Sequence, residues 1–163
     1  MEIEKNIQVS VVMGSQSDWQ TMQAACDLLE KLDVSFEKKI VSAHRTPDRL
    51  YEYAHSLRKR RVKVVIAGAG GAAHLPGMIA SKTNIPVIGV PISATDLRGV
   101  DSLYSIVQMP RGYPVATMAI GSPGAFNAAI FAIQVLAVSD RLIRQKIQDW
   151  RFDTTNRVKD EPE

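Results

Sequence analysis

The stretch Val62-Lys63-Val64-Val65-Ile66-Ala67, followed by Gly68-Ala69-Gly70-Gly71, decides the fold class of this chain. Residues 62–67 form an apolar run with a single lysine, which is typical of a parallel strand buried on both faces. Residues 75–82 follow the glycines and have the pattern of a short helix with a proline near its start. A buried strand, a glycine-rich loop and a helix together form the repeating unit of a parallel α/β protein.

The same unit recurs along the whole chain. The predicted strands cover residues 7–13, 36–41, 62–67, 86–90 and 115–120. The predicted helices cover residues 17–32, a segment opened by Thr46-Pro47, and residues 75–82, 101–107, 123–139 and 140–150. Ser17 and Gln20 fit a capping box at the start of the first helix. This alternation predicts an α/β protein, a three-layer αβα sandwich around a flavodoxin-like, doubly wound parallel sheet of five strands.

Composition indicates a single domain, residues 1–163, and excludes several classes of protein. The net charge is +3, and aromatic residues make up only 6% of the chain, so neither points to nucleic acid. Cys26 is alone, so it forms no internal disulfide, and we expect it in the core of a protein from a reducing compartment. The polar start and the short apolar stretches predict a cytoplasmic protein with no membrane segment.

The predicted helix over residues 123–139 is apolar on nearly every face. Such a helix must be buried all round, whereas an outer helix of a three-layer sandwich buries one face. A homo-oligomer would cover the other face, and the alternative is the C-terminal segment of the same chain. Residues 151–163 are polar and charged, and we expect them to form a loose C-terminal tail.

Three polar loops follow the first three predicted strands and should meet at one edge of the sheet. The first is Gly14-Ser15-Gln16-Ser17-Asp18-Trp19. Its serines and backbone N–H groups at a helix start suit an anion, and Asp18 suits sugar hydroxyls. The alternative is that Ser17 or Asp18 only caps the helix.

The second loop is Ser42-Ala43-His44-Arg45-Thr46-Pro47. Histidine is the usual proton carrier near neutral pH, and arginine is the usual planar partner of phosphate. A single histidine in a loop is more often structural. The neighbouring polar loops favour a functional role for His44 and Arg45, with Ser42 beside them.

The third loop, residues 68–77, matches a dinucleotide-binding fingerprint only in form, as Gly68-x-Gly70-x-x-Ala73. It lies in the third unit of the chain, and the next strand ends without an acid to hold a ribose. The better interpretation is a close-fitting wall, because glycine and alanine let a flat ring approach the backbone. His74 would add one polar contact. The chain has no Walker A loop, no zinc-ligand spacing and no nucleophile elbow.

Taken together and in this order, the three loops resemble the class I N5-carboxyaminoimidazole ribonucleotide mutases of purine biosynthesis. Residues 99–110 and Asp149-Trp150-Arg151 also resemble that family, so the similarity covers about residues 7 to 151. The resemblance implies a homo-octamer with active sites at subunit interfaces and no metal or organic cofactor. The implied reaction moves the carboxylate of the substrate from nitrogen to ring carbon 4.

The resemblance also implies roles for particular residues. Ser15, Asp18 and Arg45 would bind the ribose phosphate with Ser17 close by, and His44 would be the general acid–base. The candidate substrate-binding residues are Ser15, Ser17, Asp18, Ser42, Arg45, Gly70, Gly71, Ala72, His74 and Leu75, and the candidate catalytic residue is His44. The nearest rival activity is a carboxylase that uses aminoimidazole ribonucleotide and free carbon dioxide. A flavin- or nucleotide-binding module and an interaction protein built on the long helix are rivals from different classes of protein.

Overall fold

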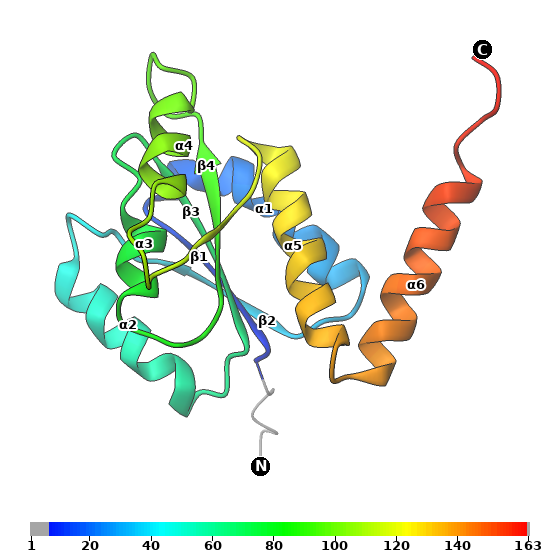
Figure 1. Ribbon diagram of the computed structural model, residues 1–163, viewed down its shortest axis with the longest axis horizontal. Helices are drawn as coiled ribbons and strands as arrows, with labels where there is room; N and C mark the ends of the chain where they lie inside the picture. The colour runs from blue at the N-terminus through cyan, green and yellow to red at the C-terminus, as the bar shows by residue number, and fades with distance from the viewer. Residues whose placement is uncertain (1–6, 163) are drawn as a thin grey trace.

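The structure is a computed structural model that describes residues 7–162, and it shows a central sheet between two layers of helices (Figure 1). The strands are β1 (Val9–Met13), β2 (Phe36–Ile40), β3 (Val64–Gly70), β4 (Val87–Ile92) and β5 (Ala116–Thr117). The helices are η1 (Gln16–Asp18), α1 (Trp19–Lys31), α2 (Pro47–Lys59), α3 (Leu75–Ala80), α4 (Val100–Val107), α5 (Ser122–Ala137) and α6 (Arg141–Asn156). The polar start, residues 1–6, lies outside the described part.

The five strands are parallel and lie in the order β2-β1-β3-β4-β5. This is the flavodoxin-like order, in which the direction of strand addition reverses between β1 and β3. The predicted doubly wound, flavodoxin-like α/β sandwich is therefore confirmed. Ligands of such sheets bind outside the carboxyl ends of the strands at that switch point.

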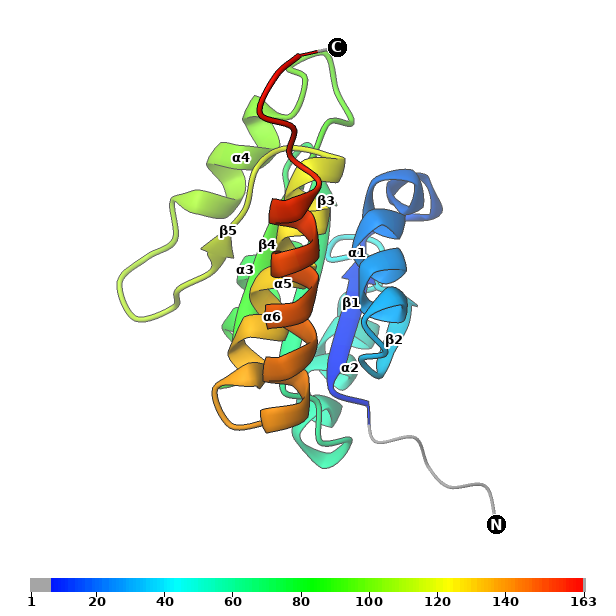
Figure 2. The ribbon, with the colours of Figure 1, turned by 90° about the vertical axis from the view of Figure 1, so that its right-hand side faces the viewer.

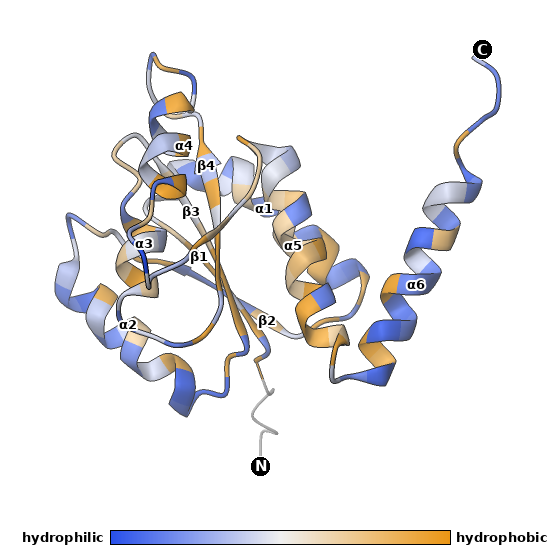
Figure 3. Cartoon of the chain, viewed as in Figure 1, coloured by the Kyte–Doolittle hydropathy of each residue, from blue (hydrophilic) through white to orange (hydrophobic). Residues whose placement is uncertain are grey.

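Alternate side chains of the strands contribute to two separate hydrophobic cores, one on each face of the sheet. Val9, Val11 and Met13 of β1 pack with α1 and α5, whereas Val12 packs with α2 and α3. The central strands β3 and β4 are buried along almost their whole length, as the apolar pattern of residues 62–67 predicts. Figure 3 shows apolar residues along the strands and on α5, whereas α2 and α6 are mostly polar.

Helix α5 packs against α1 on one side and α6 on the other, and Figure 2 shows α6 lying along it. Ile143 and Ile147 of α6 are buried in the core that α5 shares. Trp150 of α6 contacts Phe126 of α5 with ring centroids 6.0 Å apart. Within the chain, α6 therefore covers part of the outer face of α5 and leaves Phe126 and Phe131 exposed at 36% and 39%.

The expectation of a loose tail from Arg151 is wrong for the first six of those residues. Helix α6 is a new helix that begins after Asp140, whose side chain accepts from Leu142 N and Ile143 N, and it continues to Asn156. No glycine or proline interrupts residues 141–156, so nothing ends the helix at Trp150.

Two other expectations change in detail, and one is confirmed. Strand β5 has two residues where six were predicted, because it is an edge strand that pairs only with β4. The capping box lies at Ser15 and Asp18, not at Ser17 and Gln20, because a 3₁₀ turn precedes α1.

Cys26 is buried in the core as expected, and burial raises the pKa of its thiol to about 11. Between residues 7 and 162, no helix combines the length and apolarity that crossing a membrane requires.

Candidate active site

A cavity of about 340 Å³ lies at the carboxyl ends of β1, β2 and β3, at the switch point of the sheet. The lining residues come from all three predicted loops and from the segment after β4. They are Gly14, Ser15, Ser17, Asp18, Ser42, Ala43, His44, Arg45, Ala69, Gly70, Ala72, His74, Leu75 and Ala94. The structure therefore brings every predicted site residue except Gly71 into one cavity.

The first loop is held in shape by its own side chains. Asp18 Oδ2 accepts from Ser15 N at 2.9 Å, and Ser15 Oγ accepts from Ser17 N at 3.1 Å. The hydroxyls of Ser15 and Ser17 also hydrogen-bond to each other. These bonds place two hydroxyls side by side at the cavity, ahead of helix α1. Such a turn suits an anion that accepts from both serines.

Asp18 is buried, with 7% of its surface exposed, although it lies beside an open cavity. Burial raises the pKa of its carboxyl above 3.8, and this effect outweighs the opposing hydrogen bonds from Ser15 and Gly14 and the charge of Arg45. An ionised carboxylate at this buried position therefore lowers the stability of the folded protein.

Arg45 joins the first loop to the second. Its Nη2 donates to Gly14 O at 2.9 Å, and its Nε donates to Ser42 Oγ at 3.1 Å. The guanidinium group is exposed, so it retains donors for a ligand beside Ser15 and Ser17. Thr46 lies at the N-cap position of α2, but its hydroxyl accepts from Ser42 N and donates to Ser42 O, so its side chain closes the loop and does not cap the helix.

The two histidines of the site form a direct pair. His44 Nε2 lies 2.8 Å from His74 Nδ1, and the rings meet edge to face at 82°. One of the two nitrogens donates and the other accepts, so the tautomers of the two rings are coupled and each ring restrains the orientation of the other. Both side chains are exposed at the cavity, where a proton can pass between the pair and a ligand.

The third loop forms one wall of the cavity, and close packing requires its glycines. A Cβ at Gly70 would lie 2.6 Å from Ala94 Cβ, and Gly71 has a φ of +64°, which favours glycine. Gly71 lies just behind the wall and not in the lining, because its N–H points to Ser102. Gly68 lies inside β3 against Met22, which further weakens the dinucleotide fingerprint.

The sequence reasoning missed four small lining residues, Gly14, Ala43, Ala69 and Ala94. Alanine carries no chemical signal of its own. Ala94, however, follows β4, and every loop after a parallel strand reaches the same edge, so its position could have been predicted. In residues 7–162, no group of three or more His, Cys, Asp or Glu is placed to hold a metal ion.

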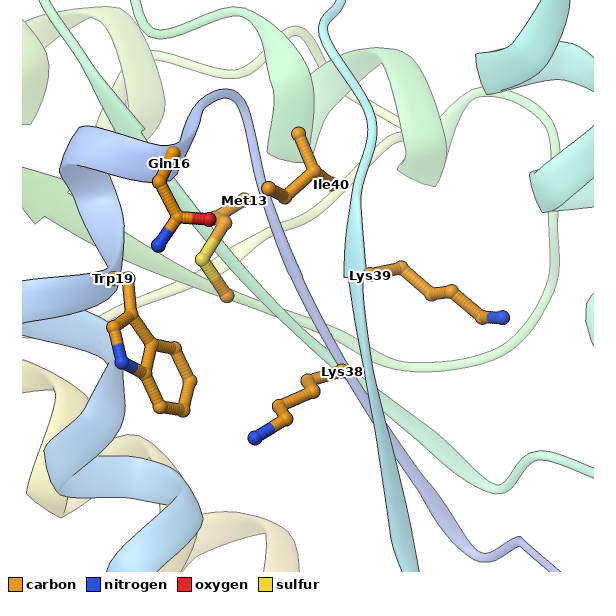
Figure 4. A pocket seen from close by; sticks show the side chains of 6 residues that line it. All are labelled: Met13, Gln16, Trp19, Lys38, Lys39 and Ile40. Carbon is orange, nitrogen blue, oxygen red and sulfur yellow. The ribbon is translucent and has the colours of Figure 1, made fainter.

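A second cavity of about 330 Å³ lies on the outer side of the first loop (Figure 4). It lies between Trp19 of α1 and edge strand β2, and it contains none of the predicted site residues. Lys38 Nζ lies 4.6 Å from the centre of the Trp19 ring, whereas Lys39 points away from that ring. The two histidines, Arg45 and the serine turn all belong to the first cavity, which is the candidate active site.

A flavodoxin-like sheet with a histidine pair, an arginine and a serine turn at its switch point defines a class of α/β enzyme that acts on small anionic molecules. Comparison with known protein families shows to which family within this class the chain belongs. A family profile described as AIR carboxylase matches residues 8–157, and the chain belongs to that family.

Curated relatives match nearly the full length of the chain, and each is named N5-carboxyaminoimidazole ribonucleotide mutase. The Haemophilus influenzae protein is 55% identical over 99% of this chain and 98% of its own length. The Bacillus subtilis protein is 57% identical over 92% of this chain and 93% of its own length. The crystal structure of Treponema denticola PurE has a TM-score of 0.83 at 23% identity, covering 91% of this chain and 92% of that one, and shows the same fold.

Proposed function

We propose that this protein is an isomerase of purine biosynthesis that converts N5-carboxyaminoimidazole ribonucleotide to its 4-carboxy isomer. Two findings support this activity. The chain belongs to the AIR carboxylase family, and relatives that are 55% and 57% identical to it are named N5-carboxyaminoimidazole ribonucleotide mutase. The observation that carries the proposal is the convergence of His44, His74 and Arg45 on one cavity with the serine turn.

The serine turn and Arg45 bind the ribose phosphate. Ser15 and Ser17 donate hydroxyl hydrogen bonds, and the guanidinium group of Arg45 supplies the compensating charge. Asp18 shapes the turn through Ser15 N and presents its other oxygen to the ribose. The imidazole ring then extends toward the wall formed by Gly70, Ala72 and His74.

The reaction needs no net gain or loss of atoms. The N–C bond to the carboxylate breaks, carbon dioxide is released inside the cavity, and the nitrogen takes a proton. Ring carbon 4 then attacks the same carbon dioxide, and a base removes the proton from that carbon to restore aromaticity. His44 serves as this proton carrier, and His74 holds its ring in place.

The wall contributes by confinement. Carbon dioxide that is held beside carbon 4 reacts in an oriented, effectively unimolecular step and not after a chance encounter. Exclusion of water keeps the released carbon dioxide and the intermediate in place. The backbone-lined surface of Gly70 and Ala72 allows the ring to lie close to the wall.

The competing activity is carboxylation of aminoimidazole ribonucleotide by free carbon dioxide, which uses the same groups. A direct assay separates the two. The protein is given N5-carboxyaminoimidazole ribonucleotide in buffer depleted of carbon dioxide, and the product is followed by mass spectrometry. The mutase proposal expects conversion to the 4-carboxy isomer until the two isomers reach equilibrium, whereas release of aminoimidazole ribonucleotide without product would contradict it.

A homo-octamer with active sites at subunit interfaces is the assembly that the family resemblance supports. Large apolar side chains are exposed on the single chain, including Tyr104 at 63%, Leu142 at 75% and Phe152 at 68%. Burial of such side chains between copies would stabilise an oligomer. Light scattering coupled to size-exclusion chromatography tests this, and a monomer at micromolar concentration would contradict it.

A further inference from the structure

Ser102 is a fully buried polar residue that lies outside the cavity. It belongs to the first turn of α4, and its Oγ makes two hydrogen bonds to other segments. The hydroxyl donates to Ile92 O, at the end of β4, at 2.7 Å and accepts from Gly71 N at 2.9 Å. One side chain therefore connects a helix, a core strand and the glycine loop that forms the cavity wall.

Gly71 lies directly behind the wall, between two residues that form it. Its φ of +64° is a left-handed backbone conformation that favours glycine. Its neighbours Gly70 and Ala72 both line the cavity. Ser105 Oγ, one turn further along α4, lies 3.3 Å from Gly71 O and 2.7 Å from Asp101 O. Helix α4 thus binds the N–H of Gly71 through Ser102 and makes a weaker contact with its carbonyl through Ser105, whose single proton is shared with Asp101 O.

The segment after β4 supports the wall from a second side. Thr95 Oγ1 donates to Asp101 Oδ2 at 2.6 Å, which ties this segment to the first turn of α4. Thr95 Cγ2 lies 3.4 Å from where a Cβ of Gly71 would be, so Thr95 packs against the turn. This hydrogen bond also lowers the pKa of Asp101, which keeps the carboxylate charged at the start of the helix.

We infer that Ser102 is a positioning residue, which fixes the wall through Gly71 so that carbon dioxide stays beside the substrate ring. This inference rests on the proposed mutase function. A buried hydroxyl that bonds two backbone groups restrains the position of the wall relative to β4 and α4. Without it, the N–H of Gly71 has no buried acceptor, and the turn can move away from the cavity.

The test is Ser102→Ala, compared with Ser10→Ala as a matched control. Ser10 is also fully buried and also makes two side-chain hydrogen bonds, but it lies inside β1 and outside the cavity lining. Each variant receives N5-carboxyaminoimidazole ribonucleotide in buffer that contains heavy-carbon bicarbonate. The measured quantities are kcat, KM and the labelled fraction of the product.

Ser102→Ala should lower kcat about 10-fold and leave KM within about 2-fold, because the phosphate site is built from other loops. The labelled fraction of its product should rise several-fold, and added bicarbonate should restore part of the lost rate. Ser10→Ala should show none of these changes. A Ser102→Ala enzyme that matches Ser10→Ala in kcat and in labelled fraction would overturn the inference.

Two further measurements keep the test decisive. If Ser102→Ala does not fold, Ser105→Ala removes the weaker contact to Gly71 and should shift the labelled fraction in the same direction, and no shift would overturn the inference. If the unaltered enzyme itself takes up the label fully, the mutase proposal fails. The role of Ser102 is then assessed from kcat and KM alone, because a fall in kcat at constant KM still indicates a positioning residue.

Discussion

The two ends of the sheet use polar residues in opposite ways. Toward the amino ends of β1 and β2, Ser10 Oγ donates to Glu37 Oε1 at 2.8 Å and lies 2.6 Å from Tyr53 Oη. Arg60 completes this network through an ion pair with Glu37. At the carboxyl ends, His44 and Arg45 are exposed, and the Arg45 guanidinium donates to one hydroxyl and one carbonyl oxygen among residues 7–162.

The difference separates stability from function. The amino-end network satisfies its own donors and acceptors inside the protein, and burial raises the pKa of Tyr53 so that it stays neutral. The carboxyl-end groups keep donors available and hold one carboxylate, Asp18, in a buried position that disfavours its charge. Substitutions at the carboxyl end should therefore change catalysis, and substitutions at the amino end should change stability.

The largest effect is expected for His44→Asn. Because the variant has no group that can remove the proton from carbon 4, kcat should fall about 10³-fold or more. Binding of the substrate, measured by calorimetry with the slow variant, should change little. Weakened binding with retained turnover would show that His44 is a ligand-holding residue and not the proton carrier.

Arg45→Ala should come next in size. Loss of a charge-assisted bond to phosphate should raise KM about 10- to 100-fold, with a smaller effect on kcat. Arg49→Ala is the control, because Arg49 is also exposed but lies outside the cavity lining. An unchanged KM in Arg45→Ala would contradict a phosphate site at the serine turn.

Ser10→Ala tests the other end of the sheet. It leaves the buried hydroxyl of Tyr53 without its hydrogen-bond partner, so the free energy of unfolding should fall by about 1–3 kcal/mol. Urea denaturation measures this loss, and kcat should stay that of the unaltered enzyme. A variant of full stability and reduced kcat would reverse the assignment of the two ends.

The smallest effect is a pH dependence at Asp18. Burial raises the pKa of Asp18 above 3.8, so the folded protein binds this proton more tightly than the unfolded chain does. The contribution of Asp18 to stability is therefore greatest at low pH and declines as the pH rises from about 3.8 through the raised pKa. Asp18→Asn should gain stability relative to the unaltered protein across that interval.

Urea denaturation between about pH 3.5 and pH 6, the range of carboxyl titration, measures this change, with Asp96→Asn as a control for the loss of one exposed negative charge. A difference between Asp18→Asn and the unaltered protein that stays constant or shrinks with rising pH would show that Asp18 is not penalised by burial.

The periodic spacing of apolar residues in the sequence was sufficient to predict the fold and the edge of the sheet at which the site lies. The strand β3 and the loops after β1 and β2 could be predicted because parallel strands end at one edge, whatever the details of packing. The extent of β5 could not, because an edge strand depends on the one partner that it pairs with. The continuation of α6 to Asn156 could have been predicted, because no glycine or proline interrupts residues 141–156.

The supporting groups of the site were also beyond sequence reasoning. Ser102 reaches the wall across a separation of 31 residues, and no local pattern distinguishes it from other serines of short helices. The pairing of His44 with His74 joins two loops that a sequence places together only approximately. Such contacts depend on side-chain geometry, which only the packed structure supplies.

The proposed mechanism depends most directly on the claim that carbon dioxide moves within the cavity without exchanging with carbon dioxide in solution. The decisive measurement supplies the unaltered enzyme with N5-carboxyaminoimidazole ribonucleotide in buffer containing heavy-carbon bicarbonate, followed by mass spectrometry of the product. The mechanism predicts a carbon-4 carboxylate without the label. A product labelled to the level of the bicarbonate would show that the carbon dioxide comes from solution and that the protein is a carboxylase.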